Sequence, residues 1–382
     1  MSFRSLVVLV CLMAVGMLAS GQLYILIPIS DRVAAHFGVA SASIPWLGMV
    51  FGLAYAVGFL FWGPASDWLG RKNVLLIGLC LTSLVSFAVA WAPSYNLEMA
   101  ARIAQGLCAA SIPPAGLALV SEMLSDRWRS TGQGMVSFSF IAAAPVAQFY
   151  AHSVDVSFPL LMTFGALSFA VVGVVLAFAG QQRDDHGVHR KHAIHKSLSE
   201  LVSSPVIITV WATSLTVLFG FVTFQILLNG QLNVAGWSQV TIRLLTVLGM
   251  TASFFVGLII RLFGDVRVLR VGLAASGFAL AAAKIGLPLP FEIVLMSIGV
   301  SCSIAGIISA ISRSASHATR GLAIAIYSFF LFIGASSAPI VARMMPSTMM
   351  LVAPIVFLVV AIALLGMPWM RVGPSPQVVA NQ

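Results

Sequence analysis

The chain has 382 residues, of which 60% are hydrophobic and 8% are charged, and its mean hydropathy is +1.03. This composition lies far outside the range of soluble domains, so it excludes a soluble enzyme or a soluble binding protein. The net charge of +9 comes from basic residues in short loops that present no continuous basic face, so nucleic acid is not an expected partner.

Apolar segments long enough to cross a bilayer recur along the whole chain. A spanning helix needs about 20 mostly apolar residues, and its backbone polar groups must be satisfied within the segment. Twelve such segments are expected, at 3–27, 46–66, 73–92, 96–121, 131–151, 157–179, 204–228, 237–260, 266–286, 291–312, 321–342 and 349–370. The sequence therefore predicts an all-α integral membrane protein.

The first apolar segment has two interpretations. Arg4 followed by an apolar stretch that ends in Leu-Ala-Ser-Gly21 is similar to a cleavable signal peptide. The apolar run continues through Leu23 to Pro28, however, which is long enough to span a membrane. We therefore interpret it as the first transmembrane helix.

The basic residues predict the orientation of the chain, because cytoplasmic loops are enriched in Lys and Arg. With a cytoplasmic N-terminus, the inner loops and termini hold Arg4, Arg71, Lys72, Arg127, Arg129, Arg183, Arg190, Lys191, Lys196, Arg261, Arg267, Arg270, Arg313, Arg320 and Arg371. The outer loops hold only Arg32, Lys284 and Arg343. Both termini are thus expected in the cytoplasm of a multi-pass plasma membrane protein, in the bacterial inner membrane, with basic loops against an anionic leaflet.

The loop between the second and third segments reads Gly63-Pro-Ala-Ser-Asp67-Trp-Leu-Gly70-Arg71-Lys72. It matches every fixed position of the pattern G-x-x-x-D-x-x-G-R-K/R, and in this it resembles the major facilitator superfamily, in particular its twelve-helix drug and metabolite:proton antiporter branch. The resemblance implies a secondary transporter whose twelve transmembrane helices form two pseudo-symmetric six-helix bundles.

The resemblance also implies that Gly63, Asp67, Gly70, Arg71 and Lys72 control conformational exchange without touching substrate. The two glycines allow helix ends to approach closely. Asp67 can accept bonds from helix amides and pair with Arg71, so that the loop locks one access state. The alternative is a plain cytoplasmic turn whose charges only set topology.

The fourth segment carries Arg102-Ile-Ala-Gln105-Gly106, which resembles the R-x-x-Q-G pattern that the family ties to proton coupling. An arginine inside a membrane is costly unless it faces a cavity or a partner. The alternative is that Arg102 snorkels outward to the headgroups. Glu98, one turn before Arg102, is the best candidate for the proton carrier.

That choice follows from where the carboxyl groups fall. All acidic residues lie in loops or within about a turn of a helix end: Asp31, Asp67, Glu98, Glu122, Asp126, Asp155, Asp184, Asp185, Glu200, Asp265 and Glu292. Proton-driven relatives often carry an acid in the first helix, where this chain has Gln22. The pattern weakens the antiport interpretation and argues against strongly cationic substrates.

The fifth segment reads Ala142-Ala-Ala144-Pro145-Val-Ala147-Gln148 and only faintly resembles the exporter motif G-x-x-x-G-P-x-x-G-G. Pro145 is kept, whereas alanines and other residues stand at the glycine positions. We expect Pro145 to serve helix packing. Export and import both remain open on this motif.

Polar and aromatic residues in the helices that line the central cleft of the family form the predicted substrate-binding set. Its members are Gln22, Tyr24, Gln148, Phe221, Gln225, Asn229, Arg243 and Tyr327, with Phe224 as a further aromatic wall. Arg243 and Arg102, if both point inward, favour an anionic or neutral substrate. Buried amides also serve helix packing, and Arg243 can snorkel, so each of these residues has a structural alternative.

The polar stretch 181–200 separates two predicted bundles, 1–180 and 201–382. It carries His186, His189, His192 and His195. A metal or pH sensor is one interpretation; we favour a solvated basic linker, because this spacing walks around a helix and no carboxylate or thiol supports a site. The four cysteines, which predict neither a disulfide nor zinc, all fall within segments: Cys11, Cys80, Cys108 and Cys302.

A shift of 194 residues relates the two halves. It aligns Gly63 with Gly257, Gly70 with Gly264, Val74 with Val268, Leu75 with Leu269 and Gly78 with Gly272. The loop after the second segment thus recurs after the eighth, as two six-helix halves require. Arg261 replaces the aspartate there, so the second lock is expected to be altered or absent.

The sequence as a whole predicts a secondary transporter that exports a small organic compound by proton-linked alternating access, with 1–180 rocking against 201–382. The alternative is an uptake permease or uniporter for an organic anion without obligatory proton antiport. No catalytic or nucleotide-binding motif is present, so neither an enzyme nor a cofactor is expected. The expected partners are a small-molecule substrate, protons and the lipid bilayer, and the protein is expected to be a monomer.

Overall fold

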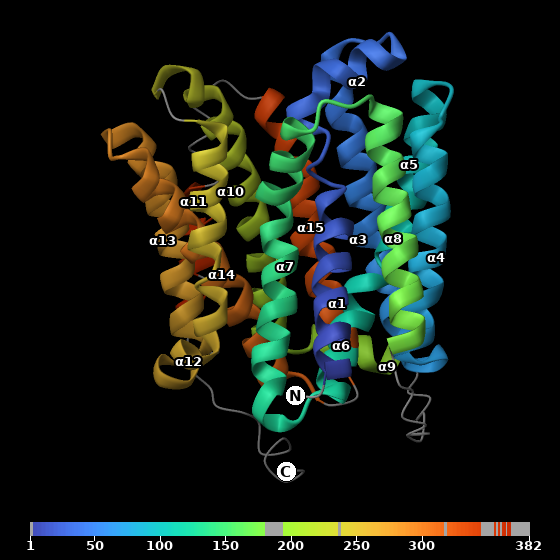
Figure 1. Cartoon of the computed structure of the whole chain (residues 1–382). Coiled ribbons are helices and arrows are strands. Elements are labelled where there is room, and N and C mark those ends of the chain that lie inside the picture. Colours follow the sequence, from blue (N-terminus) through green and yellow to red (C-terminus); the bar gives the residue numbers. More distant parts are fainter. Residues whose placement is uncertain are drawn as a thin grey trace. The chain divides into compact units, whose positions relative to one another are not determined.

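The computed structural model describes residues 3–179, 194–235, 238–316 and 319–344, with scattered residues between 355 and 367. A few side chains within these ranges lie outside the description. Every regular element in the described ranges is a helix (Figure 1). The chain divides into two compact units, residues 1–189 and 190–382, and this boundary falls inside the polar stretch 181–200.

In the first unit, long helices lie side by side and are joined by short turns (Figure 1). Its elements are α1 (Phe3–Gly21), η1 (Ile27–Ile29), α2 (Ser30–Phe37), η2 (Ser41–Ser43), α3 (Ile44–Leu69), α4 (Arg71–Ala90), α5 (Tyr95–Ala109), α6 (Ile112–Met123), α7 (Asp126–Ser153) and α8 (Phe158–Ala179). The closest helix pairs are α3 with α5, α4 with α8, and α1 with α7.

The second unit repeats this plan with fewer described helices. Its elements are α9 (Ile194–Val202), α10 (Pro205–Ala235), α11 (Gln239–Met250), α12 (Ser253–Phe263), α13 (Asp265–Ile285), α14 (Leu289–Ser314) and α15 (Arg320–Met344). The closest pairs are α13 with α14 and α10 with α15.

Ten helical stretches of the described chain are long and apolar enough to cross a membrane, against twelve expected from the sequence. The ninth expected span, 266–286, is present as α13, although α13 is not among these ten. The twelfth, 349–370, falls largely outside the described residues.

Three of the spans are broken helices. The first expected span reached residue 27, whereas α1 ends at Gly21. The chain continues through a turn in which the amides of Gln22 and Leu23 bond the carbonyl three residues back instead of four. The fourth span is broken between α5 and α6, where Pro113 and Pro114 remove two backbone donors, and the eighth is broken between α11 and α12. Such breaks leave backbone carbonyls for other partners.

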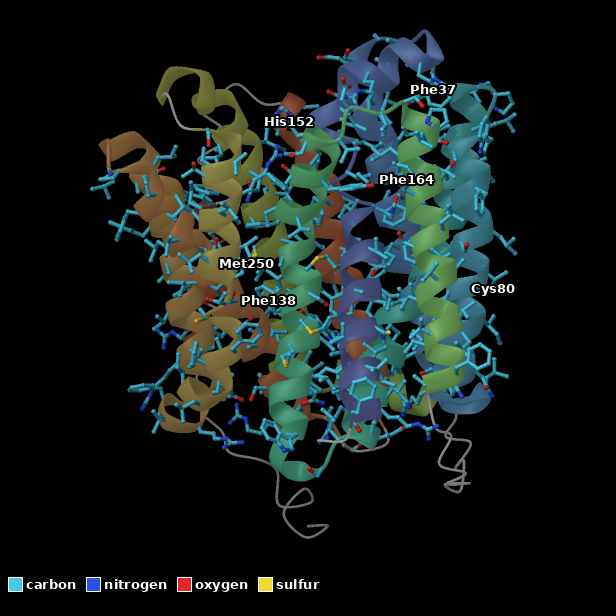
Figure 2. All side chains as sticks on the ribbon, viewed as in Figure 1. Phe37, Cys80, Phe138, His152, Phe164 and Met250 are labelled. Atoms are coloured by element: carbon cyan, nitrogen blue, oxygen red, sulfur yellow. The ribbon has the colours of Figure 1, made fainter. Side chains whose placement is uncertain are left out.

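Apolar side chains cover the outer surface of the first unit. Phe164 of α8 and Cys80 of α4 are both exposed (Figure 2). Phe61, Leu84, Val171 and Phe178 on the same group of helices are exposed as well. Exposed apolar side chains on three neighbouring helices are typical of a surface that contacts lipid.

The repeat seen in the sequence has a structural counterpart. Gly70 has φ 86° and ψ 140° between α3 and α4, and Gly264 has φ 84° and ψ 152° between α12 and α13. Only glycine adopts this region without strain. The two glycines therefore make the same sharp turn in both units.

Candidate functional site

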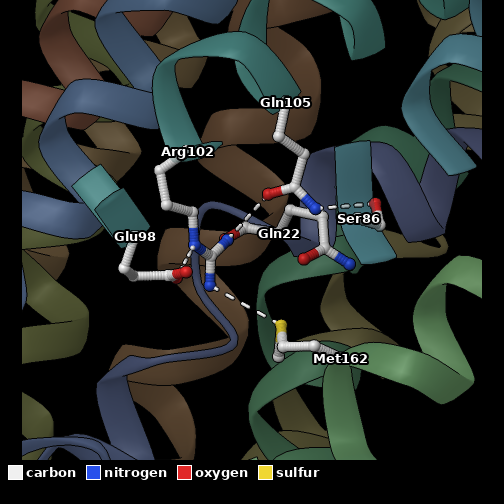
Figure 3. Close-up of polar contacts among 6 residues, drawn as sticks. All are labelled: Gln22, Ser86, Glu98, Arg102, Gln105 and Met162. Carbon is white, nitrogen blue, oxygen red and sulfur yellow. Dashed lines mark hydrogen bonds and ion pairs between the residues drawn. The ribbon is translucent and has the colours of Figure 1, made fainter. Parts of the chain in front are cut away.

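The most deeply buried charges of the described chain form an ion pair within α5. Arg102 and Glu98 are both 0% exposed, and the Nε of Arg102 donates to the Oε1 of Glu98 at 3.1 Å (Figure 3). The two residues lie one turn apart, so the helix places both on one face. Arg102 therefore points into the protein, and the alternative that it snorkels outward to the headgroups does not hold.

Gln105 extends this pair toward α4. The Nη1 of Arg102 donates to the Oε1 of Gln105 at 3.1 Å, and the Nε2 of Gln105 donates to Ser86 at 2.8 Å (Figure 3). The hydroxyl of Ser86 in turn donates to the carbonyl of Thr82 at 2.6 Å. The chain of bonds fixes the orientation of the Gln105 amide, so that its oxygen faces the guanidinium.

Arg102 also donates a hydrogen bond to the turn that follows α1. Its Nη1 donates to the backbone carbonyl of Gln22 at 3.3 Å, and its Nη2 lies 3.7 Å from the sulfur of Met162 in α8 (Figure 3). The carbonyl of Gln22 is one of those left by the end of the helix. Arg102 thus joins α5, α8 and the broken end of α1.

Two buried oxygen atoms at this site lack a hydrogen-bond partner among the described residues. They are the Oε2 of Glu98 and the Oε1 of Gln22. An unsatisfied buried polar atom costs free energy, so it usually marks a site where a proton, water or ligand binds. Gly106 follows directly and packs tightly, because a Cβ there would lie 2.3 Å from the carbonyl oxygen of Phe51 in α3.

The loop after α3 forms a second polar cluster. Arg71 donates through Nε to the Oε1 of Glu122 in α6 at 3.1 Å and through Nη1 to Ser66 at 3.4 Å. Ser66 also donates to the carbonyl of Gly63 at 2.8 Å, and Lys72 donates to the carbonyl of Ala177 at 3.4 Å. The side chain of Asp67 lies outside the described residues, so its predicted pairing with Arg71 stays a prediction.

The loop after α12 carries a reversed pair. Asp265 stands directly after Gly264, and its Oδ2 lies 3.0 Å from the Nε of Arg313 in α14. Asp265 also accepts at 2.8 Å from the backbone amide of Val266, one residue along. The second lock was expected to be altered or absent; the described structure has an ion pair there in which the acid and the base have changed places.

The predicted substrate-binding residues fall in both units. In the first unit Gln22 and Tyr24 lie in the turn after α1 and Gln148 lies in α7, and all three are buried. In the second unit the members with described side chains are also buried: Phe221, Phe224, Gln225, Arg243 and Tyr327. The side chain of Asn229 lies outside the described residues. Substrate binding by this set stays a prediction.

Three further expectations concern single elements. Pro145 is buried inside α7, which continues through it from Asp126 to Ser153. The four cysteines are free thiols. The histidine-rich segment lies outside the described residues, and no group of metal-binding side chains occurs in the described part of the chain.

The sequence did not indicate several partners in these clusters. Ser86, Met162 and the carbonyl of Gln22 contact the Arg102 cluster from other helices. Glu122 and Arg313 each stand one residue before the end of a helix, α6 and α14. The 194-residue shift could have found the second loop pair, because it places Asp265 opposite Arg71.

Known proteins similar to this chain are membrane transporters. The sequence model of the Major Facilitator Superfamily matches residues 12–283, more than half of the chain. Multidrug resistance protein MdtL of Shewanella oneidensis is 25% identical over 269 residues, which cover 66% of this chain and 65% of that protein. Quinolone resistance protein NorA of Staphylococcus aureus is 23% identical over 208 residues, 53% of each chain. The chain thus spans less than two thirds of the length of either relative.

A solved structure shares the fold. The crystal structure of a bacterial homologue of the human lysosomal transporter Spinster, in an inward-facing and unoccupied conformation, has a TM-score of 0.70 and 13% identity, and the match covers 100% of this chain and 99% of that one. The match to the family model shows that the chain belongs to the major facilitator superfamily, a family of multi-pass membrane proteins.

Proposed function

We propose that the protein exports a small organic compound by proton-linked alternating access, with the Glu98–Arg102 pair as its proton-coupling site. The observation that carries the proposal is a fully buried ion pair whose carboxylate keeps one oxygen without a described partner and whose arginine holds the end of a broken helix. The pair thus combines a carboxylate oxygen that can bind a proton with an arginine that contacts the turn after α1.

Proton binding at Glu98 has a direct consequence for Arg102. A protonated carboxyl group no longer attracts the guanidinium as an ion, so the pair weakens. Arg102 then keeps its bonds to Gln105 and to the carbonyl of Gln22. Uptake of one proton therefore changes the balance of forces on the turn after α1, where the predicted substrate residues Gln22 and Tyr24 lie.

The two relatives support export as the direction. Both carry names that record resistance to drugs, which is the outcome of moving compounds out of a cell. The same relatives, which are bacterial, support an inner-membrane location. The excess of basic residues in one set of loops supports cytoplasmic termini.

The two loop pairs fit the role of gates. Arg71 forms an ion pair with Glu122 in the first unit, and Asp265 forms one with Arg313 in the second. Except for Asp265, the four side chains are at least 32% exposed, so the pairs are weak enough to break and re-form during a transport cycle. We assign Gly63, Gly70 and Lys72 to the same first gate, together with Asp67 as the sequence pattern implies.

The ion pair between Glu98 and Arg102 argues against an anion uniporter. That alternative required Arg102 and Arg243 to offer their charges to a substrate. Glu98 already binds Arg102 at 3.1 Å, so the charge of Arg102 is compensated. Support for an anionic substrate then rests on Arg243 alone.

Purified protein in liposomes loaded with a pH dye tests the proposal. Organic anions, neutral drugs and organic cations are added in turn while proton movement and substrate flux are recorded. We expect one class of compound to drive protons in the opposite direction. Substrate flux without any proton response would overturn proton-linked export and favour the uniporter.

A further inference from the structure

We propose that Glu292 is a second proton-binding carboxyl group, in the second unit, at the place that corresponds to Glu98 in the first. The proposal rests on proton-linked transport for its role in the cycle. That Glu292 binds a proton inside the protein follows from the geometry of the second unit and does not depend on that role.

The two glutamates occupy equivalent places. The 194-residue shift that aligns Gly70 with Gly264 also aligns Glu98 with Glu292. Each glutamate lies three residues after the first residue of its helix, Tyr95 in α5 and Leu289 in α14. Gly70 and Gly264 have similar backbone angles, which shows that the 194-residue shift relates equivalent structural positions as well as similar sequences.

The surroundings of the two glutamates differ. Glu292 is 3% exposed, its Oε2 is buried without a hydrogen-bond partner, and no ion pair or hydrogen bond joins its side chain to another described residue. Position 296, which corresponds to Arg102, is Met296, a fully buried residue that carries no charge. The second unit thus keeps the buried carboxyl group and lacks the arginine that compensates it.

The helices packed against α14 place few charged residues near Glu292, at the N-terminal end of α14. They are α10, α11, α12, α13 and α15, and α10 has no titratable residue. The titratable residues on the other helices and on α14 itself are Arg243, Arg261, Asp265, Arg267, Arg270, Lys284, Cys302, Arg313, Arg320, Tyr327 and Arg343. The pair of Asp265 with Arg313 places the first turn of α13 at the opposite end of α14 from Glu292.

Arg243 is the described cation at the same end as Glu292. Gly249 of α11 packs on Val294 and Ser297 of α14, and Val256 further along packs with Cys302, so the two chain segments run in parallel. Arg243 therefore lies toward the start of α14, yet no ion pair joins it to Glu292 in the described structure. The side chains of Lys284 and Arg343 lie outside the description.

A buried carboxyl group in this setting favours its neutral form. An ionised carboxylate without a partner in the interior is energetically unfavourable, and the group avoids this cost by binding a proton. Glu98 differs because Arg102 stabilises its charge.

In the transport cycle the step is simple and balanced. The carboxylate of Glu292 takes up one proton from water to form a neutral acid, and it returns that proton to water when the site is open to the other side. No covalent bond besides the O–H bond forms or breaks. Two such sites, one in each unit, would allow the protein to move more than one proton for each substrate.

Infrared difference spectroscopy of the full-length protein in liposomes tests proton binding directly. We expect the wild type to show the carbonyl band of a protonated carboxylic acid near neutral pH, and Glu292→Gln to lose that band. Asp155→Asn, which removes a fully exposed carboxyl group, is the matched control and should leave it unchanged. A band that persists in Glu292→Gln, or the loss of ionised carboxylate bands instead, would overturn the proposal.

Two further measurements keep the test sharp. If Glu292→Gln does not fold, Glu292→Asp is expected to shift the same band. In dye-loaded liposomes Glu292→Gln should move fewer protons per substrate than the wild type. Weaker binding of an organic cation with an unchanged proton count would identify a substrate contact and overturn the proposal. If the wild type moves no protons with any compound, the proposed function fails, while the infrared result still decides whether Glu292 binds a proton.

Discussion

The loops that follow α3 and α12 have the same backbone and opposite charges. Gly70 and Gly264 turn the chain with nearly equal angles, and the next residue pairs with the penultimate residue of a neighbouring helix in each unit. In the first unit that residue is Arg71, which forms an ion pair with the acid Glu122; in the second it is Asp265, which forms an ion pair with the base Arg313. The comparison teaches that the geometry of the turn and the presence of a pair are shared, whereas the sign of each charge is free to change.

The buried glutamates show a different kind of divergence. Glu98 keeps an arginine one turn along its helix, and Glu292 has Met296 at that place. A solvent-accessible pair can reverse because water screens either sign. A buried charge cannot lose its partner without changing its protonation. The interior of the two units has therefore diverged in chemistry as well as in sequence.

The largest expected effect separates the buried pair from a surface pair. Arg102→Met should lower the free energy of unfolding by about 3–5 kcal/mol, because it leaves Glu98 buried without its cation. Asp155→Asn, at an exposed pair with Arg32, should leave the free energy of unfolding nearly unchanged. Chemical unfolding in detergent measures both. Equal costs at the two sites would contradict the interior position of Arg102, and adding Glu98→Gln to Arg102→Met should recover part of the loss.

A smaller effect is expected at the two turn glycines. Gly70→Ala and Gly264→Ala should each destabilise the protein by about 1–3 kcal/mol, because their backbone conformation is strained for any other residue. A Cβ meets nothing within 4 Å at Gly264 and only Asn73 at 3.9 Å at Gly70, so crowding adds little. The same unfolding experiment should give similar values. A clear difference between the two would show that the turns are not equivalent.

The smallest effect concerns the reversed loop pairs. Asp265→Arg alone should bias the equilibrium between access states by about 1 kcal/mol, because it places two cations together. Adding Arg313→Glu gives the second unit the arrangement of the first and should restore transport. Initial rates in liposomes measure the cycle of single and double variants. A double variant no better than the worse single would mean that the two side chains do not act as a pair.

Hydropathy indicated most of the fold, because a spanning helix needs a long apolar run whatever its neighbours are. It missed the breaks after Gly21 and before Ile112, since apolar composition is blind to where a backbone leaves the helix.

The site was predictable where its partners share a helix. The spacing of Glu98 and Arg102 places them on one face, and the structure joins them at 3.1 Å. The carbonyl of Gln22 and the sulfur of Met162 come from positions 80 and 60 residues away, and tertiary packing alone brings them to Arg102. The sequence did not predict the pairing of Asp265, because Arg261 stands at the position that corresponds to Asp67 and the acid lies four residues further along the chain.

The most direct test of proton coupling compares two kinds of transport in Glu98→Gln, whose uncharged side chain resembles the protonated glutamate. One is substrate accumulation driven by a pH gradient; the other is exchange of labelled for unlabelled substrate at equal pH, which needs no net proton movement. The account predicts that Glu98→Gln loses gradient-driven accumulation and keeps exchange. Accumulation at the wild-type level in a folded Glu98→Gln protein would contradict it.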